Sequence, residues 1–257
     1  MTRPAVRLPR LEAVGRDAWC VLGHSHALSG LATGAATLPW APVHGAVAQG
    51  AWVAACGGFA MLPDLDQQRT TISRMWGPLT DLPAALINKV SGGHRWGTHD
   101  AILGPVAFGL LAAAAAKSFP TSLLFLAVAI GLALRALNFV IPGRVENTIV
   151  GNLVLSWGGA WLFLAHSPTP MWLPYAVAVG CLAHIAGDAL TREGIPVPLI
   201  WVVHRCRIHP IHLRTGATVE KVVFVPLFFV ATLAFLYLNT GMHTAVEPVV
   251  QQLLGQG

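Results

Sequence analysis

The sequence predicts an all-α protein, a polytopic membrane helical bundle with six or seven spans. Hydrophobic residues make up 54% of the 257 residues and charged residues only 11%, whereas about a quarter of the residues in soluble domains are charged. The mean hydropathy is +0.61. A soluble domain of this length needs more charge to cover its surface. The composition therefore argues against a soluble enzyme and a nucleic-acid-binding domain, and favours a protein whose partner is the lipid bilayer.

Seven stretches are candidate spans, because about 18 uncharged apolar residues can cross the hydrocarbon core as a helix. The stretch Ala27–Val43 is the weakest, since Pro39 and Pro42 interrupt its end, and it is either a full span or a re-entrant half-helix. The other six are Gly45–Leu62, Ala101–Ala116, Thr121–Ile141, Thr148–Ala165, Trp172–Leu190 and Val222–Leu238.

The basic residues predict the orientation of the chain. With seven spans and an inside N-terminus, nearly all of the 16 Lys and Arg fall in inside segments. By the positive-inside rule, we expect a multi-pass protein of the cell inner (cytoplasmic) membrane with a cytoplasmic N-terminus. The expected regions are a cytoplasmic N-terminal tail (1–23), a membrane-embedded helical domain (24–239) and a C-terminal tail (240–257).

Four groups of polar residues interrupt the apolar pattern, and each lies at the cytoplasmic end of a predicted span. We therefore expect them to converge. They are His24 and His26; Asp64 and Asp66; His94, Arg95, Thr98, His99 and Asp100; and His184 and Asp188.

Each group also has a plainer interpretation. The first histidine pair suits an interfacial position, the aspartate pair suits a helix stop and turn, and His94-Arg95 suits a loop attracted to lipid phosphate. His184 and Asp188 are the hardest to explain in this way. Residues four apart share a helix face, and an ionisable pair inside an apolar helix is costly and usually functional.

Together these side chains suit a divalent metal. Imidazole and carboxylate ligands bind Zn²⁺, Mn²⁺ or Fe²⁺, and we expect Zn²⁺. Cysteines do not accompany the motifs, which disfavours a closed thiolate site. Three or four protein ligands with an open position would activate a water at neutral pH.

The ordered motifs resemble the YdjM-type family, a family of inner-membrane proteins regarded as metal-dependent hydrolases. The resemblance extends over residues 24–220, although Asp100 departs from the family pattern, in which we expect Ser. It rests on His26 with Gly30, Leu62-Pro63-Asp64-Leu65-Asp66, His94-Arg95-Trp96-Gly97-Thr98-His99, His184-x-x-Gly187-Asp188-x-x-Thr191-x-x-Gly194 and Thr215-Gly216-x-x-x-Glu220.

The resemblance implies a distant similarity to zinc-dependent phospholipase C, and through it the roles of individual residues. Asp188 would bridge two metals, Asp64 and Asp66 would supply a ligand and the general base, and Arg95 or Arg135 would hold a phosphate. The implied metal ligands are His26, Asp64 or Asp66, His99, His184 and Asp188.

Several other polar residues are further candidates for the site. His24 and His94 flank the implied ligands, and Glu220 would reach the site from the start of the final span. Arg135 lies inside a predicted span, where snorkelling to the headgroups is an equal explanation. The basic cluster of residues 204–212 is either a second metal site or a lipid-facing loop.

Together with what the resemblance implies, these observations lead us to expect a membrane-bound metal-dependent hydrolase of phosphoesters at the cytoplasmic membrane face, with a phospholipid or another phosphoester as substrate. The alternatives are an ion or solute transporter and a non-catalytic membrane protein with a structural metal. A transporter would spread ionisable groups through the membrane depth, whereas here they gather at one face.

Overall fold

The computed structural model describes residues 20–142, 145–166, 170–213 and 218–241. Except for residues 20–23 and 240–241, the predicted tails lie outside this range, as does the Thr215-Gly216 part of the last motif.

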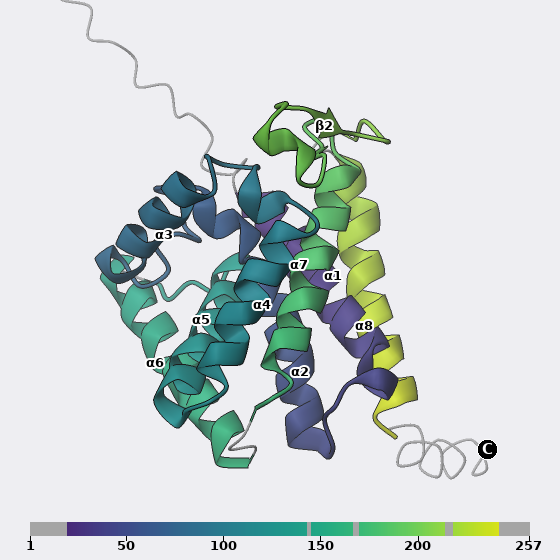
Figure 1. Cartoon of the computed structure of the whole chain (residues 1–257). Coiled ribbons are helices and arrows are strands. Elements are labelled where there is room, and N and C mark those ends of the chain that lie inside the picture. The colour runs from purple at the N-terminus through teal and green to yellow at the C-terminus, as the bar shows by residue number, and fades with distance from the viewer. Residues whose placement is uncertain (1–19, 143–144, 167–169, 214–217, 242–257) are drawn as a thin grey trace, which may run out of the picture.

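The described residues form a bundle of eight α-helices with one small hairpin (Figure 1). Strands β1 (Ile195–Pro196) and β2 (Arg207–Ile208) pair in antiparallel fashion near the end of α7. The helices are α1 (Cys20–Ala36), α2 (Ala46–Phe59), α3 (Pro78–Val90), α4 (Leu103–Ala115), α5 (Phe119–Ala136), α6 (Val145–His166), α7 (Leu173–Ala189) and α8 (Val225–Asn239).

Four helical segments among the described residues are long and apolar enough to cross a membrane, so the predicted six or seven spans are not confirmed. Helices α4 and α7 are apolar but shorter, and α1 has 17 residues and ends before Pro39. The four long segments are Ala46–Asp66, Phe119–Ala136, Val145–His166 and Glu220–Asn239.

Helix α1 begins earlier than the apolar pattern predicts. Because it starts at Cys20, His24 and His26 lie within the helix and not in front of it. Their spacing along α1 therefore sends the two side chains in different directions: His26 is buried and His24 is half-buried.

Helix α3 was not predicted, because the segment between Asp66 and His94 has neither the length nor the apolarity of a span. Its exposed apolar side chains follow helical spacing and form one stripe. Such a stripe is typical of a helix that lies in the membrane interface. The stripe consists of Leu79, Leu82, Leu86 and Val90.

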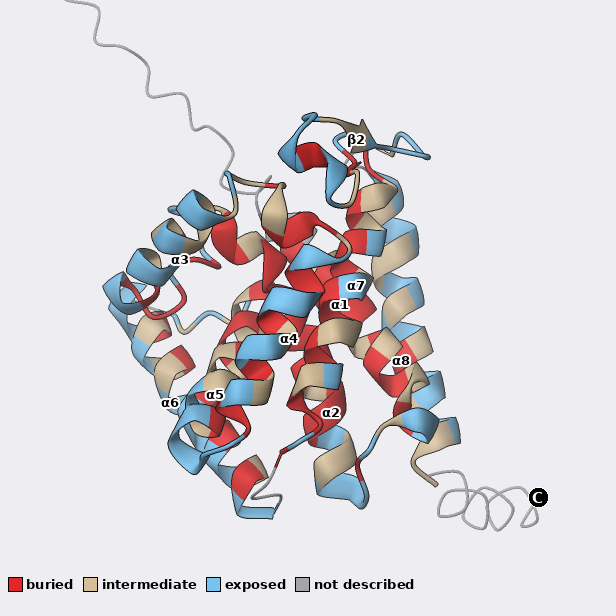
Figure 2. Cartoon of the chain, in the orientation of Figure 1, coloured by how far each residue is buried: buried red, intermediate tan, exposed pale blue. Residues whose placement is uncertain are grey.

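The core of the bundle is formed by α1, α2 and α7, which are largely buried, whereas α3, α6 and α8 are more exposed (Figure 2). Glycines allow the central helices to approach closely. A Cβ atom added at Gly58 would lie 2.0 Å from the carbonyl oxygen of Ala129 on α5, and one at Gly180 would lie 2.6 Å from the carbonyl oxygen of Cys56. Small residues have this role at many helix contacts in membranes.

The contact at Gly58 yields a stability prediction. Gly58→Ala forces α2 away from α5 and is expected to lower the free energy of unfolding by about 1–3 kcal/mol, measured by thermal unfolding in detergent. Gly158→Ala is the matched control, because an added Cβ meets no atom within 4 Å there. Equal stability of the two variants would contradict the close packing.

Candidate metal centre

The four polar groups predicted from the sequence meet at one end of the bundle, the upper end in Figure 1. Helix α1 starts there and α7 ends there. The turn η2 (Pro63–Asp66) follows α2, and the turn η3 (Gly97–His99) precedes α4. Because α7 contacts η2 and η2 contacts η3, residues far apart in the sequence become neighbours.

Four possible ligand atoms from three segments lie at or beside the paired imidazole nitrogens of His99 and His184. They are Oδ1 of Asp64, Nε2 of His99, Nε2 of His184 and Oδ2 of Asp188. Nε2 of His99 lies 3.2 Å from Nε2 of His184, 3.6 Å from Asp64 and 3.3 Å from Asp188. Nε2 of His184 lies 3.7 Å from Asp64 and 3.6 Å from Asp188.

Three of these atoms, from Asp64, His99 and His184, form a group that could hold a metal ion. Ligand atoms bound to zinc at about 2.1 Å in a tetrahedron lie about 3.4 Å from one another, and the three distances within this group are 3.2, 3.6 and 3.7 Å. Within the described part of the chain, both oxygens of the fully buried Asp188 lack a hydrogen-bond partner. Since buried polar groups normally have one, the carboxylate suits a cation.

The carboxylates also make the site electrically negative. Burial lowers the pKa of the His99 imidazole, but its interactions with Asp64 and Asp66 and the charge of Asp188 outweigh burial and raise that pKa to about 9. Three carboxylates around one buried ring therefore stabilise a positive charge at this point.

Asp66 points to a different set of partners from Asp64. Its Oδ1 lies 2.6 Å from Nδ1 of His94. Its Oδ2 accepts hydrogen bonds from the hydroxyl of Thr98 and the backbone N–H of Arg95, and it lies 3.6 Å from Nδ1 of His99. Asp66 therefore contacts residues 94–99, whereas Oδ1 of Asp64 lies near the imidazole nitrogens of His99 and His184.

Arg95 and His26 contact the second oxygen of Asp188. Nη2 of Arg95 lies 3.2 Å from Oδ1 of Asp188, and Nε2 of His26 lies 3.4 Å from the same oxygen. The His26 ring stacks on the His184 ring with centroids 3.9 Å apart. Arg95 has a φ of 61°, a left-handed conformation that costs about 1–2 kcal/mol for a residue with a side chain. Its backbone and side-chain contacts to two aspartates compensate for that cost.

A second group of possible ligands overlaps the first. It consists of His26, His184 and Asp188, and it shares His184 with the group of Asp64, His99 and His184. The close approach of the Arg95 guanidinium to Oδ1 of Asp188 disfavours a second cation there, because like charges repel.

The remaining candidates from the sequence lie at various distances from these groups. Half-buried His24 belongs to neither group. Nε of Arg135 donates to the carbonyl oxygen of Thr71 at the end of α5. Glu220 accepts a hydrogen bond from Ser25 on α1 and lines a cavity together with His26. The rings of His209 and His212 contact each other, but neither belongs to a ligand group among the described residues.

Asp100, named in the sequence pattern but given no role, fastens the hairpin segment to the bundle. Its Oδ1 accepts the backbone N–H groups of Ile102 and Leu103 at the start of α4. Its Oδ2 accepts the N–H of Leu199 and Nε1–H of Trp201, at 2.7 and 2.8 Å. A serine hydroxyl cannot accept from both sides in this way, so the departure from the family pattern has a structural explanation.

We expect Asp100→Ala to loosen residues 195–208 from α4. The loss of a buried, charged acceptor is expected to cost roughly 2–3 kcal/mol and to speed limited proteolysis within that segment, mapped by mass spectrometry. Asp81→Ala is the control, since its ion pair with Arg74 is solvent-exposed and such pairs contribute about 1 kcal/mol or less. Unchanged proteolysis of Asp100→Ala would refute the fastening role.

Comparison with curated proteins and with solved structures finds no match to the chain. A family model, described as YdjM inner membrane protein, matches residues 21–138. This range runs from α1 to α5 and includes His26, Asp64 and His99, whereas His184 and Asp188 lie beyond it. Together with the apolar helices, the match identifies a membrane protein that sits in a lipid bilayer. The resemblance predicted from the sequence is therefore confirmed over residues 21–138, which match the YdjM inner membrane protein family.

Proposed function

We propose that this protein is a metal-dependent hydrolase of phosphoesters at the cytoplasmic face of the inner membrane. The proposal rests on the group of three possible ligand atoms from Asp64, His99 and His184, spaced 3.2 to 3.7 Å apart. Oδ2 of Asp188 lies 3.3 Å from Nε2 of His99 and 3.6 Å from Nε2 of His184. Two imidazoles and two carboxylates form a donor set that suits zinc, with manganese or iron as further possibilities.

The proposal assigns one divalent cation to these four residues. When bound, such a cation lowers the pKa of a coordinated water and stabilises negative charge on a phosphoryl oxygen. Arg95 and His26 hold the other oxygen of Asp188, which fixes the direction in which this carboxylate faces. Outer contacts of this kind orient ligands in metal sites.

His94 is assigned the proton transfer. Its Nδ1 lies 2.6 Å from Asp66, which favours the tautomer with the proton on Nδ1 and leaves Nε2 as an acceptor. Its ring lies edge-on to His99 with centroids 5.4 Å apart. In hydrolysis a new P–O bond forms from water as the bond to the leaving oxygen breaks. Nε2 of His94 takes the proton of the water and returns it to the leaving oxygen.

A cluster of arginines supports an anionic substrate. The guanidinium groups of Arg205 and Arg207 lie 4.7 and 4.5 Å from the centre of the Trp96 ring. Burial and the nearby charge of Arg95 lower the pKa of Arg207. The guanidinium groups of Arg205 and Arg207 add positive charge near Arg95, which favours the approach of a phosphate.

The assigned membrane face is supported by the distribution of the basic residues. Nearly all Lys and Arg belong to segments that the positive-inside rule assigns to the cytoplasm, and residues 63–100 are among them. The exposed apolar stripe of α3, which lies in that segment, suits the membrane interface.

We expect His184→Ala and Asp188→Ala to lose bound metal and to lower the hydrolysis of bis(p-nitrophenyl) phosphate by at least about 100-fold, because each removes a ligand. Metal content is measured by elemental analysis of the purified protein. His44 is exposed and lies in the segment between α1 and α2. His44→Ala is the control, and we expect it to retain its bound metal and its rate of hydrolysis.

Two outcomes would contradict the proposal. Metal content equal to wild type in both variants would refute the ligand assignment. Tight metal binding without hydrolysis of any phosphoester tested would indicate that the metal is structural, and it would refute the proposed hydrolase activity.

A further inference from the structure

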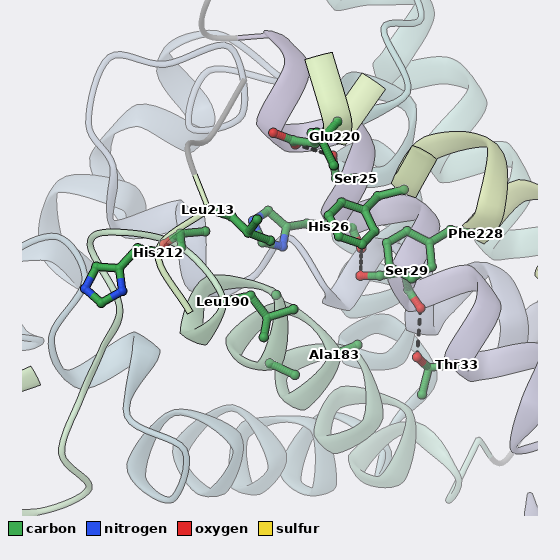
Figure 3. A pocket seen from close by; sticks show the side chains of 15 residues that line it. Ser25, His26, Ser29, Thr33, Ala183, Leu190, His212, Leu213, Glu220 and Phe228 are labelled. Atoms are coloured by element: carbon green, nitrogen blue, oxygen red, sulfur yellow. Dashed lines mark hydrogen bonds between the residues drawn. The ribbon is translucent and has the colours of Figure 1, made fainter. Parts of the chain in front are cut away.

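A cavity of about 420 Å³ lies between α1, α7 and the start of α8. Its size falls within the usual range of small-molecule sites, about 300–1,000 Å³. Ser25, Ser29 and Thr33 of α1 line one side, four residues apart and therefore on one helix face. Ala183 and Leu190 of α7 and Phe228 of α8 line the others (Figure 3). The cavity therefore follows α1 over about 12 Å, at 1.5 Å per residue.

Helix α8 is tied to α1 on both sides of this cavity. At one end the hydroxyl of Ser25 donates to Glu220. At the other end Nδ2 of Asn239 donates to the carbonyl oxygen of Ala35, at 2.9 Å. Between these two ties, Phe224 and Phe228 face the cavity. Glu220–Phe224 forms a π-helix, a distortion that is often found at functional sites.

Beyond Ser25, the side of the cavity formed by α1 is effectively apolar, although Ser29 and Thr33 carry hydroxyl groups. The hydroxyl of Ser29 donates to the carbonyl oxygen of His26, and that of Thr33 donates to the carbonyl oxygen of Ser29. Since these hydroxyls bond to their own helix, they offer little to a ligand. The other polar residues of the lining belong to the opposite end of the cavity; they are Ser25, His26, Thr191, His212 and Glu220. There Ser25 donates to Glu220, and Thr191 donates to the carbonyl oxygen of Asp188.

That polar end adjoins the proposed metal centre. His26 lines the cavity and also contacts Asp188, and Thr191 lines it and lies 3.4 Å from Nη1 of Arg95. Gly187 permits this junction, because a Cβ atom there would lie 3.0 Å from the His26 ring. The apolar part of the cavity thus leads to the residues that would hold a cation and a phosphate.

We propose that this cavity binds the hydrocarbon chain of the substrate, and that the substrate is an amphiphilic lipid phosphoester. The inference rests on the proposed function and adds its substrate class. The occupant is an aliphatic chain because the walls are apolar and elongated, the outer faces of α8 are exposed where lipid would surround them, and the polar end meets the cationic side chains. A soluble phosphoester has no hydrocarbon chain, so it would leave the apolar part of the cavity empty.

The test compares butyl and dodecyl p-nitrophenyl phosphate as substrates of the zinc-loaded protein in nanodiscs. Each buried methylene contributes up to roughly fourfold, so we expect wild-type kcat/KM for the dodecyl ester to exceed that for the butyl ester by at least about 100-fold. Thr33→Phe fills the end remote from His26. It is expected to abolish this preference while the butyl ester is hydrolysed within about twofold of wild type.

Phe228→Ala and Phe229→Ala form a matched pair on α8. Phe228 lines the cavity, whereas Phe229 does not and is exposed. We expect Phe228→Ala alone to reduce the preference for the dodecyl ester. Retention of the full preference by both Thr33→Phe and Phe228→Ala would overturn the chain site.

A second readout separates this inference from the hydrolase proposal. Dodecyl phosphate with a diazirine at the end of its chain is cross-linked to protein freed of metal by a chelator, and labelled residues are mapped by mass spectrometry. Labelling around Thr33, Ala183 and Phe228 supports the chain site even where no ester is hydrolysed. Labelling confined to exposed residues of α8 and α6 would overturn it, whatever the activity.

Discussion

The rest of the structure is organised around the buried carboxylate of Asp188. It lies inside an apolar helix, fully buried and, among the described residues, without a hydrogen-bond donor to either oxygen. A buried charge is stable only when paired or bound to a metal. His26 and Arg95 approach one oxygen and His99 and His184 the other. Four segments of the chain must therefore meet at one end of the bundle, and the close packing of α1, α2 and α7 permits it.

This arrangement connects the proposed chemistry to the membrane. The ligand atoms lie at the end of the bundle that carries the exposed apolar stripe of α3, and the cavity along α1 runs from that end toward the middle of the helices. A lipid entering between α1 and α8 would keep its chain in apolar surroundings while its phosphate approaches the arginines. Under these proposals the helix bundle would supply both the site and a path from the bilayer to it.

The sequence predicted the helical membrane bundle, and its motifs pointed to one end, because hydropathy, charge asymmetry and i, i+4 spacing are local signals. The separate environments of Asp64 and Asp66 were not predictable, since both follow Pro63 and only the folding of residues 94–98 around Asp66 distinguishes them. Helix α3 escaped prediction because it is too short and polar for a span. The predicted six or seven spans are not confirmed, because α4 and α7 are apolar but shorter than the four long segments.

The most direct test of the central claim is zinc K-edge X-ray absorption, with the metal content, of the full-length protein loaded with zinc and freed of excess metal. The account predicts one zinc per chain with two imidazole nitrogens and carboxylate oxygens at about 2.0–2.1 Å. It also predicts loss of this signal in Asp188→Ala. Zinc bound through sulfur, two zinc ions per chain or no retained zinc would contradict it.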